Sequence, residues 1–388
     1  MSEIRVAFFL DHVAWLGGVN YYRNLFSAIQ SVPEVMICPV VITGLTSDIS
    51  KFEDNVEVIR TSILERYTIS WWISKFLIKI FPRRDYLLYL FLRKHRINLI
   101  SHNCLLWKEC KIPSIGWIPD FQHLHLPEFF DKSECEARDH QFMDIISRCK
   151  SVILSSQDAL NDLNRFYTNK NTSTHILRFV STPHDTIDTL PNQAELYARY
   201  NIDRPWFYLP NQFWAHKNHI AVIDALRLLK EQGDDFLVIA TGSTNDSRNE
   251  GYYASLMQKV NDYGLNESFR SLGVIPYSDV VALMKYSIAV INPSLFEGWS
   301  TSVEESKSLG KMVVLSDIPV HREQKPNRGY YFNPHNPNEL ANNMKAIMEA
   351  FSKEKEFSQY TKAKKQYVLN RKSFAKQFEK ICYDVLNK

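Results

Sequence analysis

The chain has 388 residues, of which 45% are hydrophobic and 23% are charged, a composition that excludes a disordered or low-complexity protein and predicts two globular domains or one large one. The formal charge of +3 is too small to indicate a nucleic-acid partner. Six scattered cysteines without a C-x-x-C pair argue against a disulfide framework and favour a reducing cytoplasm. Neither a signal peptide nor a run of ~18 uncharged apolar residues is expected.

Short apolar runs alternate along the chain with amphipathic segments such as 21–30 and 219–233. Continuous apolar runs between turn residues are typical of buried parallel strands, and the segments between them are typical of crossover helices. A polar stretch at 181–205 interrupts the alternation and is the best linker candidate. The sequence therefore predicts two Rossmann-like α/β halves, with strands within 4–10, 35–43, 114–119, 151–156, 206–210, 236–241, 269–274, 288–294 and 311–317.

Two features lie where a predicted strand leads into a helix. Gly17 and Gly18 precede the first amphipathic helix, where paired glycines allow backbone amides to approach a phosphate. The alternative is a plain tight turn. Lys217 lies ahead of the helix 219–233 and is a suitable point charge for a diphosphate, the alternative being a solvated lysine at a helix start.

Three carboxylates surround the start of a helix predicted from about Thr301 to Gly310. Thr301 and Glu304 fit a capping box, which accounts for Glu304. Glu297 lies in the loop after a strand, where a ligand would bind, and Glu305 lies about one turn into the helix. Because carboxylates accept hydrogen bonds from paired hydroxyls, Glu297 is expected to bind a hexose and Glu305 a ribose.

Residues 60–97 combine aromatic side chains with an excess of cations. This is typical of a surface that rests on anionic lipid headgroups, although core aromatics with solvated cations are an equal alternative. The histidines and cysteines at 102–125 lack the short paired spacings of zinc ligands, so no metal site is expected.

The spacing of Glu297, seven residues and Glu305, within 292–323, resembles the signature of family 4 retaining glycosyltransferases. GGVNYY at 17–22, IPDFQHLHLPEFF at 118–130 and HKNHIAVIDAL at 216–226 are similar to further motifs of that family, in the same order. The resemblance implies a GT-B fold, in which two Rossmann-like domains face each other across a cleft. It implies an acceptor-side domain at 1–185, joined by a C-terminal helix at about 372–388, and a nucleotide-sugar-binding domain at 186–371.

The resemblance also implies roles for single residues. Gly17, Gly18 and the amides of Trp299, Ser300 and Thr301 would contact the donor diphosphate, and Lys217 would neutralise it. Glu305 would hold the ribose, and Glu297 would engage the transferred sugar.

The chain departs from the family pattern at two positions. Gln212 stands where the family usually has an arginine, five residues before Lys217. Pro119 replaces the histidine of a His-Asp pair and leaves Asp120, so that His123 becomes the candidate for the missing imidazole.

By this analogy the protein is expected to transfer a hexose from a nucleotide diphosphate sugar to a glycan or lipid-linked acceptor, with retention of configuration and without metal or cofactor. The expected location is the cytoplasm, with peripheral association at the inner face of the cytoplasmic membrane. A non-catalytic nucleotide-sugar or glycan-binding protein is the main alternative, because Gln212 and Pro119 depart from the pattern. A sugar-nucleotide epimerase or a phosphorylase is a weaker one, and fold alone would not separate them.

Overall fold

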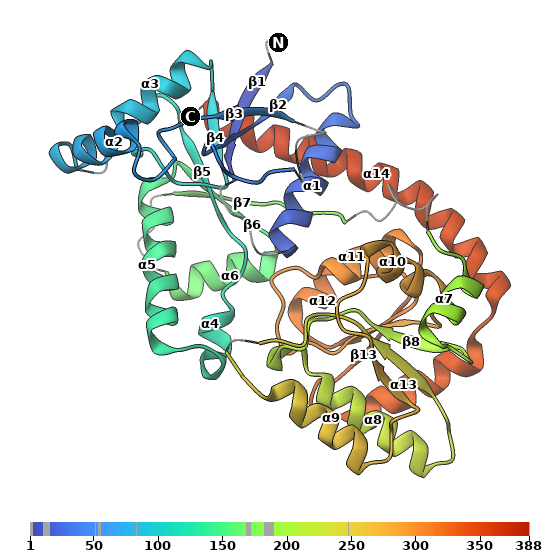
Figure 1. Cartoon of the computed structure of the whole chain (residues 1–388). Coiled ribbons are helices and arrows are strands. Elements are labelled where there is room, and N and C mark those ends of the chain that lie inside the picture. Colours follow the sequence, from blue (N-terminus) through green and yellow to red (C-terminus); the bar gives the residue numbers. More distant parts are fainter. Residues whose placement is uncertain are drawn as a thin grey trace. The chain divides into compact units, whose positions relative to one another are not determined.

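The computed structural model describes residues 3–10, 16–50, 52, 56–82, 84–167, 172–181, 190–246 and 248–387 (Figure 1). The chain forms two compact units. Unit 1 comprises Met1–Phe121, Glu136–Val180 and Leu369–Lys388, and unit 2 comprises Gln122–Cys135 and Ser181–Val368. The chain therefore passes from unit 1 to unit 2 between residues 180 and 181, and returns to unit 1 between 368 and 369. The boundaries expected from the sequence were 185/186 and 371/372. Unit 2 also includes the segment 122–135.

Unit 1 contains, within its described residues, a seven-stranded parallel sheet of order β3-β2-β1-β4-β5-β6-β7. Ala7 and Phe8 of β1 point to opposite faces, as neighbours in a strand do. Ala7 packs with Leu88 and Leu92 of α3, whereas the Phe8 ring lies 4.9 Å from Phe26 of α1. The strands are β1 Ile4–Phe9, β2 Ile37–Thr43, β3 Glu57–Arg60, β4 Leu99–Ser101, β5 Ser114–Ile118, β6 Ser151–Leu154 and β7 Ser173–Ile176. The helices are α1 Leu16–Gln30, α2 Ile69–Ile80, α3 Tyr86–Lys94, α5 Lys132–Arg148 and α6 Gln157–Phe166.

Unit 2 has, in its described part, a six-stranded parallel sheet of order β10-β9-β8-β11-β12-β13. The strands are β8 Trp206–Leu209, β9 Leu237–Ala240, β10 Phe269–Ser271, β11 Val290–Asn292, β12 Val313–Ser316 and β13 Gly329–Phe332. The helices are α4 Gln122–His125, α7 Gln193–Tyr200, α8 His219–Glu231, α9 Tyr252–Asp262, α10 Tyr277–Tyr286, α11 Thr301–Ser308, α12 Pro319–Gln324 and α13 Pro337–Ala350, with short 3₁₀ turns at Pro127–Phe129 and Ala215–Lys217. The expected class of two Rossmann-like α/β domains is confirmed.

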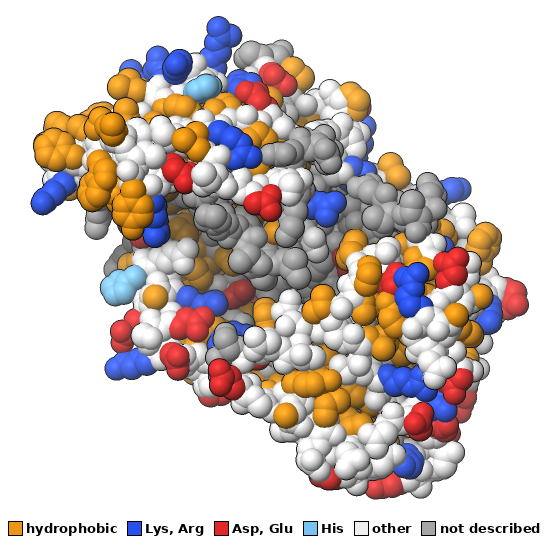
Figure 2. All heavy atoms as spheres, in the orientation of Figure 1, with side chains coloured by type: hydrophobic (Ala, Val, Ile, Leu, Met, Phe, Trp, Pro, Cys, Tyr) orange, Lys and Arg blue, Asp and Glu red, His pale blue; other side chains and the backbone are white. Residues whose placement is uncertain are grey.

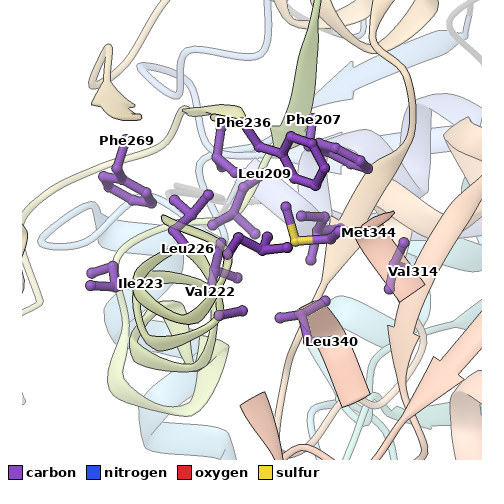
Figure 3. Packing of buried hydrophobic residues seen from close by; sticks show 14 of the residues in the cluster. Phe207, Leu209, Val222, Ile223, Leu226, Phe236, Phe269, Val314, Leu340 and Met344 are labelled. Carbon is purple, nitrogen blue, oxygen red and sulfur yellow. The ribbon is translucent and has the colours of Figure 1, made fainter. Parts of the chain in front are cut away.

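Both faces of the unit 2 sheet are buried, which explains why its strands are continuous apolar runs. Phe207 and Leu209 of β8 face α8 and α13, where they pack with Leu226 and Met344 (Figure 3). Trp206, on the opposite side of the same strand, belongs to a second buried cluster. Each face of the sheet therefore has its own apolar core.

Some elements were not predicted. The nine expected strands are present, but β3, β4, β7 and β13 are only three or four residues long and were missed. The linker prediction was wrong at 193–200, where α7 begins with a capping box of Asn192 and Glu195 and buries Leu196. Residues 182–189 lie outside the described residues. The C-terminal helix expected at about 372–388 begins earlier, because it is the end of α14 Lys353–Leu386, a helix of 34 residues.

Candidate functional site

The candidate site in unit 2 lies at the carboxyl ends of β8 and β11. Numbered within the unit, the strand order is 3-2-1-4-5-6, so β8 and β11 are the neighbours between which the order reverses. Ligands of open α/β sheets bind at this point, next to the carboxyl ends of the strands. The loop after β8 carries Gln212 and Lys217, and the loop after β11 carries Glu297.

These two loops are held together by hydrogen bonds. The backbone N–H of Leu295 donates to the carbonyl oxygen of His216 at 2.8 Å. The Asn218 amide donates to the carbonyl oxygens of Pro293 at 3.1 Å and Pro334 at 2.9 Å. Asn218 has a φ of 54°, a conformation that asparagine tolerates better than most residues, and it ends the 3₁₀ turn that carries Lys217. The side chain of Lys217 is thereby brought over the second loop.

Lys217 and Glu297 form a nearly buried ion pair, with 2.7 Å between Nζ and Oε1. The side chains are 15% and 9% exposed. Burial by itself raises the pKa of Glu297, but Lys217, His321 and a hydrogen bond from Ser294 outweigh it and lower the pKa to about 2. Glu297 is therefore a carboxylate at any physiological pH, and it faces the Lys217 ammonium.

A network of polar side chains connects Glu297 to the end of β11 and the start of α11. The Ser294 hydroxyl lies 2.7 Å from both Glu297 Oε1 and Asn292 Oδ1. The Asn292 amide donates to the hydroxyl oxygens of Ser300 at 2.8 Å and Ser302 at 3.2 Å. Asn292 ends β11 and is fully buried, so its amide links the strand, the loop and the start of α11. Such a network fixes the position of the carboxylate.

The expected capping box at Thr301 and Glu304 is wrong. The N-cap of α11 is Ser300, without a side-chain cap. Gln324 of α12 instead bonds to the backbone of Ser300, with its side-chain oxygen accepting from the Ser300 N–H at 3.3 Å and its amide donating to the Ser300 carbonyl at 2.9 Å. Glu304 instead accepts from Gln324 and Lys307, each at 2.9 Å. Trp299, Ser300 and Thr301 thus lie at the N-terminus of α11, where the helix dipole favours an anion.

Glu305 lies on α11 in a different environment from Glu297. It is 5% exposed, and burial raises its pKa to about 7, against the effect of hydrogen bonds from Tyr277 and Ser181. The Tyr277 hydroxyl donates to Oε1 at 2.6 Å, and the Ser181 hydroxyl donates at 3.3 Å. Two carboxylates of one loop and helix therefore differ in pKa by several units because only Glu297 is paired with a cation.

The loop that carries Gln212 packs against the loop after β9. Gly242 has a φ of 142°, and a Cβ there would lie 2.6 Å from the carbonyl oxygen of Asn211 and 2.7 Å from Cα of Gln212. Nearby, the guanidinium of Arg248 lies 5.1 Å from the Trp214 ring and 5.1 Å from the Phe130 ring. Arg248 also contributes to the lowered pKa of His216, for which burial is the main cause. A cation is therefore present near the Lys217 loop even though Gln212 is not one.

The segment 122–135 belongs to unit 2 because its rings pack there. His125 lies 5.1 Å from Phe296, the residue before Glu297, and Phe130 contacts Arg248. His123, on the same short helix α4, is buried. Asp120 lies before the boundary, in unit 1, and its carboxylate is 3.8 Å from Arg138.

Gly17 and Gly18 belong to unit 1. They were expected in the turn before the first helix, but they are the second and third residues of α1. The rest of that expected turn, 11–15, lies outside the described residues. Within α1, Tyr21 is hydrogen-bonded to Nε2 of His102 at 2.6 Å, and burial lowers the pKa of His102 to about 3. A neutral tyrosine-histidine pair thus occupies the carboxyl end of β4.

The structure places Gln212, Lys217, Glu297, Glu305 and residues 299–301 after the carboxyl ends of the two central strands of unit 2, β8 and β11. Sequence reasoning missed their supporting residues, which are Asn292, Ser294, Tyr277, Gln324, Ser181, Arg248 and His321. Asn292 and Ser294 could have been found, since they lie at the carboxyl end of a predicted strand, where ligands of open α/β sheets bind. Among the described residues, no three His, Cys, Asp or Glu side chains form a group suited to a metal ion.

Part of the chain matches a known family. Residues 199–364 match the family model described as glycosyl transferases group 1, a range that contains the whole Gln212 to Glu305 site. The chain is 25% identical over 189 residues to the O-antigen chain mannosyltransferase RfbU of Salmonella typhimurium. That match covers 49% of this chain and 48% of the relative, so the chain spans about half the length of the curated relative it matches.

Two solved structures have the same fold over nearly the whole chain. Sucrose-phosphate synthase of Thermosynechococcus elongatus has a TM-score of 0.72 at 15% identity, covering 99% of this chain and 100% of that one. HepE of Anabaena, in complex with UDP and glucose, has a TM-score of 0.68 at 15% identity, covering 98% and 99%. The fold is thus that of the GT-B glycosyltransferases.

Proposed function

We propose that this protein is a glycosyltransferase that moves a hexose from a nucleotide diphosphate sugar to a glycan or lipid-linked acceptor with retention of configuration. It would be a member of the group 1 family, and of family 4 within it. The observation that carries the proposal is the Lys217–Glu297 pair at the reversal of the strand order, inside the range that matches the family model.

The arrangement fits a donor with a diphosphate and a sugar. Lys217 supplies a cation, and the N-terminus of α11 at 299–301 supplies backbone donors, both suited to a diphosphate. A diphosphate would compete with Glu297 for the Lys217 ammonium, which would leave the Glu297 carboxylate available to sugar hydroxyls. Glu305, once ionised, accepts hydrogen bonds strongly and suits the paired hydroxyls of a ribose.

The proposed reaction is a displacement at the anomeric carbon. The bond from that carbon to the diphosphate oxygen breaks, and a bond to the acceptor oxygen forms on the same face. The proton of the acceptor hydroxyl passes to the departing phosphate oxygen. Lys217 and the amides at 299–301 would stabilise the developing charge of the diphosphate without reorganising, which is where most of the rate acceleration would arise. Asp120 and His123 remain candidates for contacts to the transferred sugar.

The donor and the acceptor are further parts of the proposal. HepE was solved with UDP and glucose, and RfbU is named as an O-antigen chain mannosyltransferase, so UDP-glucose and the nucleotide diphosphate mannoses are the first donors to examine. We infer that no metal or cofactor is needed, because the charge of the diphosphate can be met by Lys217 and α11. A cytoplasmic location is consistent with six cysteines that form no disulfide.

The test is a donor panel of UDP, GDP, ADP and dTDP hexoses without added metal, with release of the nucleoside diphosphate and transfer to a lipid-linked glycan as the readouts. We expect one donor to be used, and Lys217→Met to lose at least ~30-fold in kcat/KM, or ~2 kcal/mol. Glu267→Ala, a change at an exposed carboxylate, is the control. Product anomers resolved by NMR test retention, and full activity of the Lys217 variant would remove its role.

A non-catalytic nucleotide-sugar or glycan-binding protein is the second candidate. Gln212 and Pro119 favour it, because each removes a group that the family pattern places near the donor. The same panel separates the two candidates. A donor that raises the melting temperature through Glu305, but is never consumed, would establish binding without turnover.

A further inference from the structure

Helix α2 presents an apolar face to solvent (Figure 2). The exposed fractions are 81% for Ile69, 58% for Trp72, 46% for Ile73, 62% for Phe76 and 52% for Ile80. Their spacings of three, four, seven and eleven residues from Ile69 place them on one side of the helix. Half-exposed aliphatic and aromatic side chains in a row cost free energy in water unless another surface covers them.

The inward side of α2 is mixed. Trp71, Leu77 and Ile78 are half-buried there, and Ser74 is the buried residue, whose hydroxyl donates to Asp85 at 2.7 Å. Asp85 in turn caps α3 by accepting from the Leu88 N–H at 2.9 Å. An ordinary surface helix has its apolar residues on the inward face alone, whereas α2 is also apolar on its outward face. The serine-aspartate contact helps to hold the helix while that outward face stays exposed.

The apolar face continues beyond α2. Eight of the seventeen large hydrophobic side chains that are exposed in the described part of the chain lie between 67 and 90. They are Tyr67, Ile69, Trp72, Ile73, Phe76, Ile80, Phe81 and Leu90. In Figure 2 hydrophobic side chains gather over α2, with Lys and Arg at the margin of the patch.

The exposed charges around this face are positive. Lys75 and Lys79 project from α2 itself, and Arg66 and Arg84 flank it, all exposed. The sequence of α2 contains no acidic residue. Lys75 lies 5.7 Å from the Trp71 ring, so an aromatic ring and an ammonium meet at the edge of the patch. This combination attracts a surface that is apolar inside and anionic outside.

We propose that α2 with its flanking residues 66–68, 81, 82 and 84 is a docking surface for anionic lipid bilayers, with the α2 face inserted among the acyl chains and the cations at the headgroups. A second copy of this chain is disfavoured as the occupant, because two such faces would bring like charges together. This inference does not depend on the proposed transfer activity. In the described part of the chain no helix has the length and apolar character to cross a bilayer, so the contact would lie in the interface plane.

The test is flotation of the full chain with vesicles of phosphatidylcholine alone or mixed equally with phosphatidylglycerol. We expect binding to the mixed vesicles, weakened about tenfold or more by Trp72→Ser with Phe76→Ser, and also by Lys75→Gln with Lys79→Gln. Phe357→Ser is the control, since Phe357 is 75% exposed on α14 in unit 2. The replaced side chains are exposed, so unchanged circular dichroism should accompany the loss.

Two outcomes would overturn the proposal. The first is no flotation, or flotation that does not distinguish the two lipid mixtures. The second is a dimer in solution that the Trp72 and Phe76 changes convert to a monomer without vesicle binding in either state, which would assign the face to a second copy.

Discussion

The ammonium nitrogen of Lys217 lies 2.7 Å from Oε1 of Glu297, although 80 residues separate them in the chain. Because both side chains are nearly buried, loss of either partner leaves the other charge without compensation. We expect Lys217→Met or Glu297→Gln to lower the free energy of unfolding by about 3–5 kcal/mol.

The double variant should lose less unfolding free energy than the two single variants lose together, with a difference of at least about 1 kcal/mol. The measurement is urea unfolding followed through hydrogen exchange of unit 2 peptides. Arg227 and Glu231 form a matched control, a 2.6 Å pair with exposed side chains whose removal should be nearly additive. Strict additivity at Lys217 and Glu297 would show that the two charges are solvated independently.

The raised pKa of Glu305 predicts that the stability of the fold depends on pH. Its pKa is about 7 in the folded chain against an ordinary value of 4.5, so between these values the folded state keeps a proton that the unfolded state has released. Stability from this group is therefore full below pH 4.5 and is lost as pH rises through about 7. Relative to the wild type, Glu305→Gln should gain up to about 3 kcal/mol between about pH 5 and about pH 8. Identical pH profiles in urea unfolding would contradict the raised pKa.

Gly310 ends α11 in a conformation that also leaves no room for a side chain. Its φ is 65°, and a Cβ would lie 2.6 Å from the carbonyl oxygen of Gln359 on α14. Gly310→Ala should lower the free energy of unfolding by about 2–3 kcal/mol, from backbone strain together with displacement of α14. Gly233→Ala isolates the strain, since Gly233 has a φ of 86° and nothing within 4 Å of its added Cβ, and it should cost about 1 kcal/mol. Equal losses of unfolding free energy in the two variants would mean that displacing α14 costs nothing.

Arg248 joins the segment 122–135 to the loop after β9. Its guanidinium lies between the Phe130 and Trp214 rings, each 5.1 Å away. Arg248→Ala should cost about 1–2 kcal/mol and accelerate amide hydrogen exchange in 122–135. Arg322→Ala, which removes a similar contact to Tyr331 at 3.8 Å, should leave that segment unchanged. Unaltered exchange in 122–135 after loss of Arg248 would show that His125 and Phe296 hold the segment alone.

The sequence was sufficient for features that repeat locally. Apolar runs located nine strands, and the position of each candidate residue relative to a strand end located Lys217, Glu297 and Glu305. It was insufficient where partners are distant. Gln324 bonds to the backbone of Ser300 from 24 residues away, so no local pattern could reveal this contact. The pairing of Lys217 with Glu297, and the lack of a cation beside Glu305 among the described residues, are likewise set by tertiary contacts.

Some strands were missed for another reason. β3, β7 and β13 lie at the edges of their sheets and are mostly half-exposed, so they lack the continuous apolar run that marks a buried strand. Helix α7 was hidden by the prolines and turn formers around it, although Asn192 and Glu195 form a recognisable capping box. Short polar stretches between domains therefore need to be checked for caps before they are assigned as linkers.

Unit 1 is assembled from three separate stretches, the last of which is the end of α14. Phe374, Phe378 and Cys382 of that stretch are buried, and the Phe378 ring lies 6.0 Å from Phe8 of β1. During synthesis, β1 therefore lacks its contact with the end of α14 until that segment is made, hundreds of residues later. All residues of unit 2 are made by Val368, before the last stretch of unit 1 exists. Unit 1, whose synthesis begins first, is therefore the unit completed last.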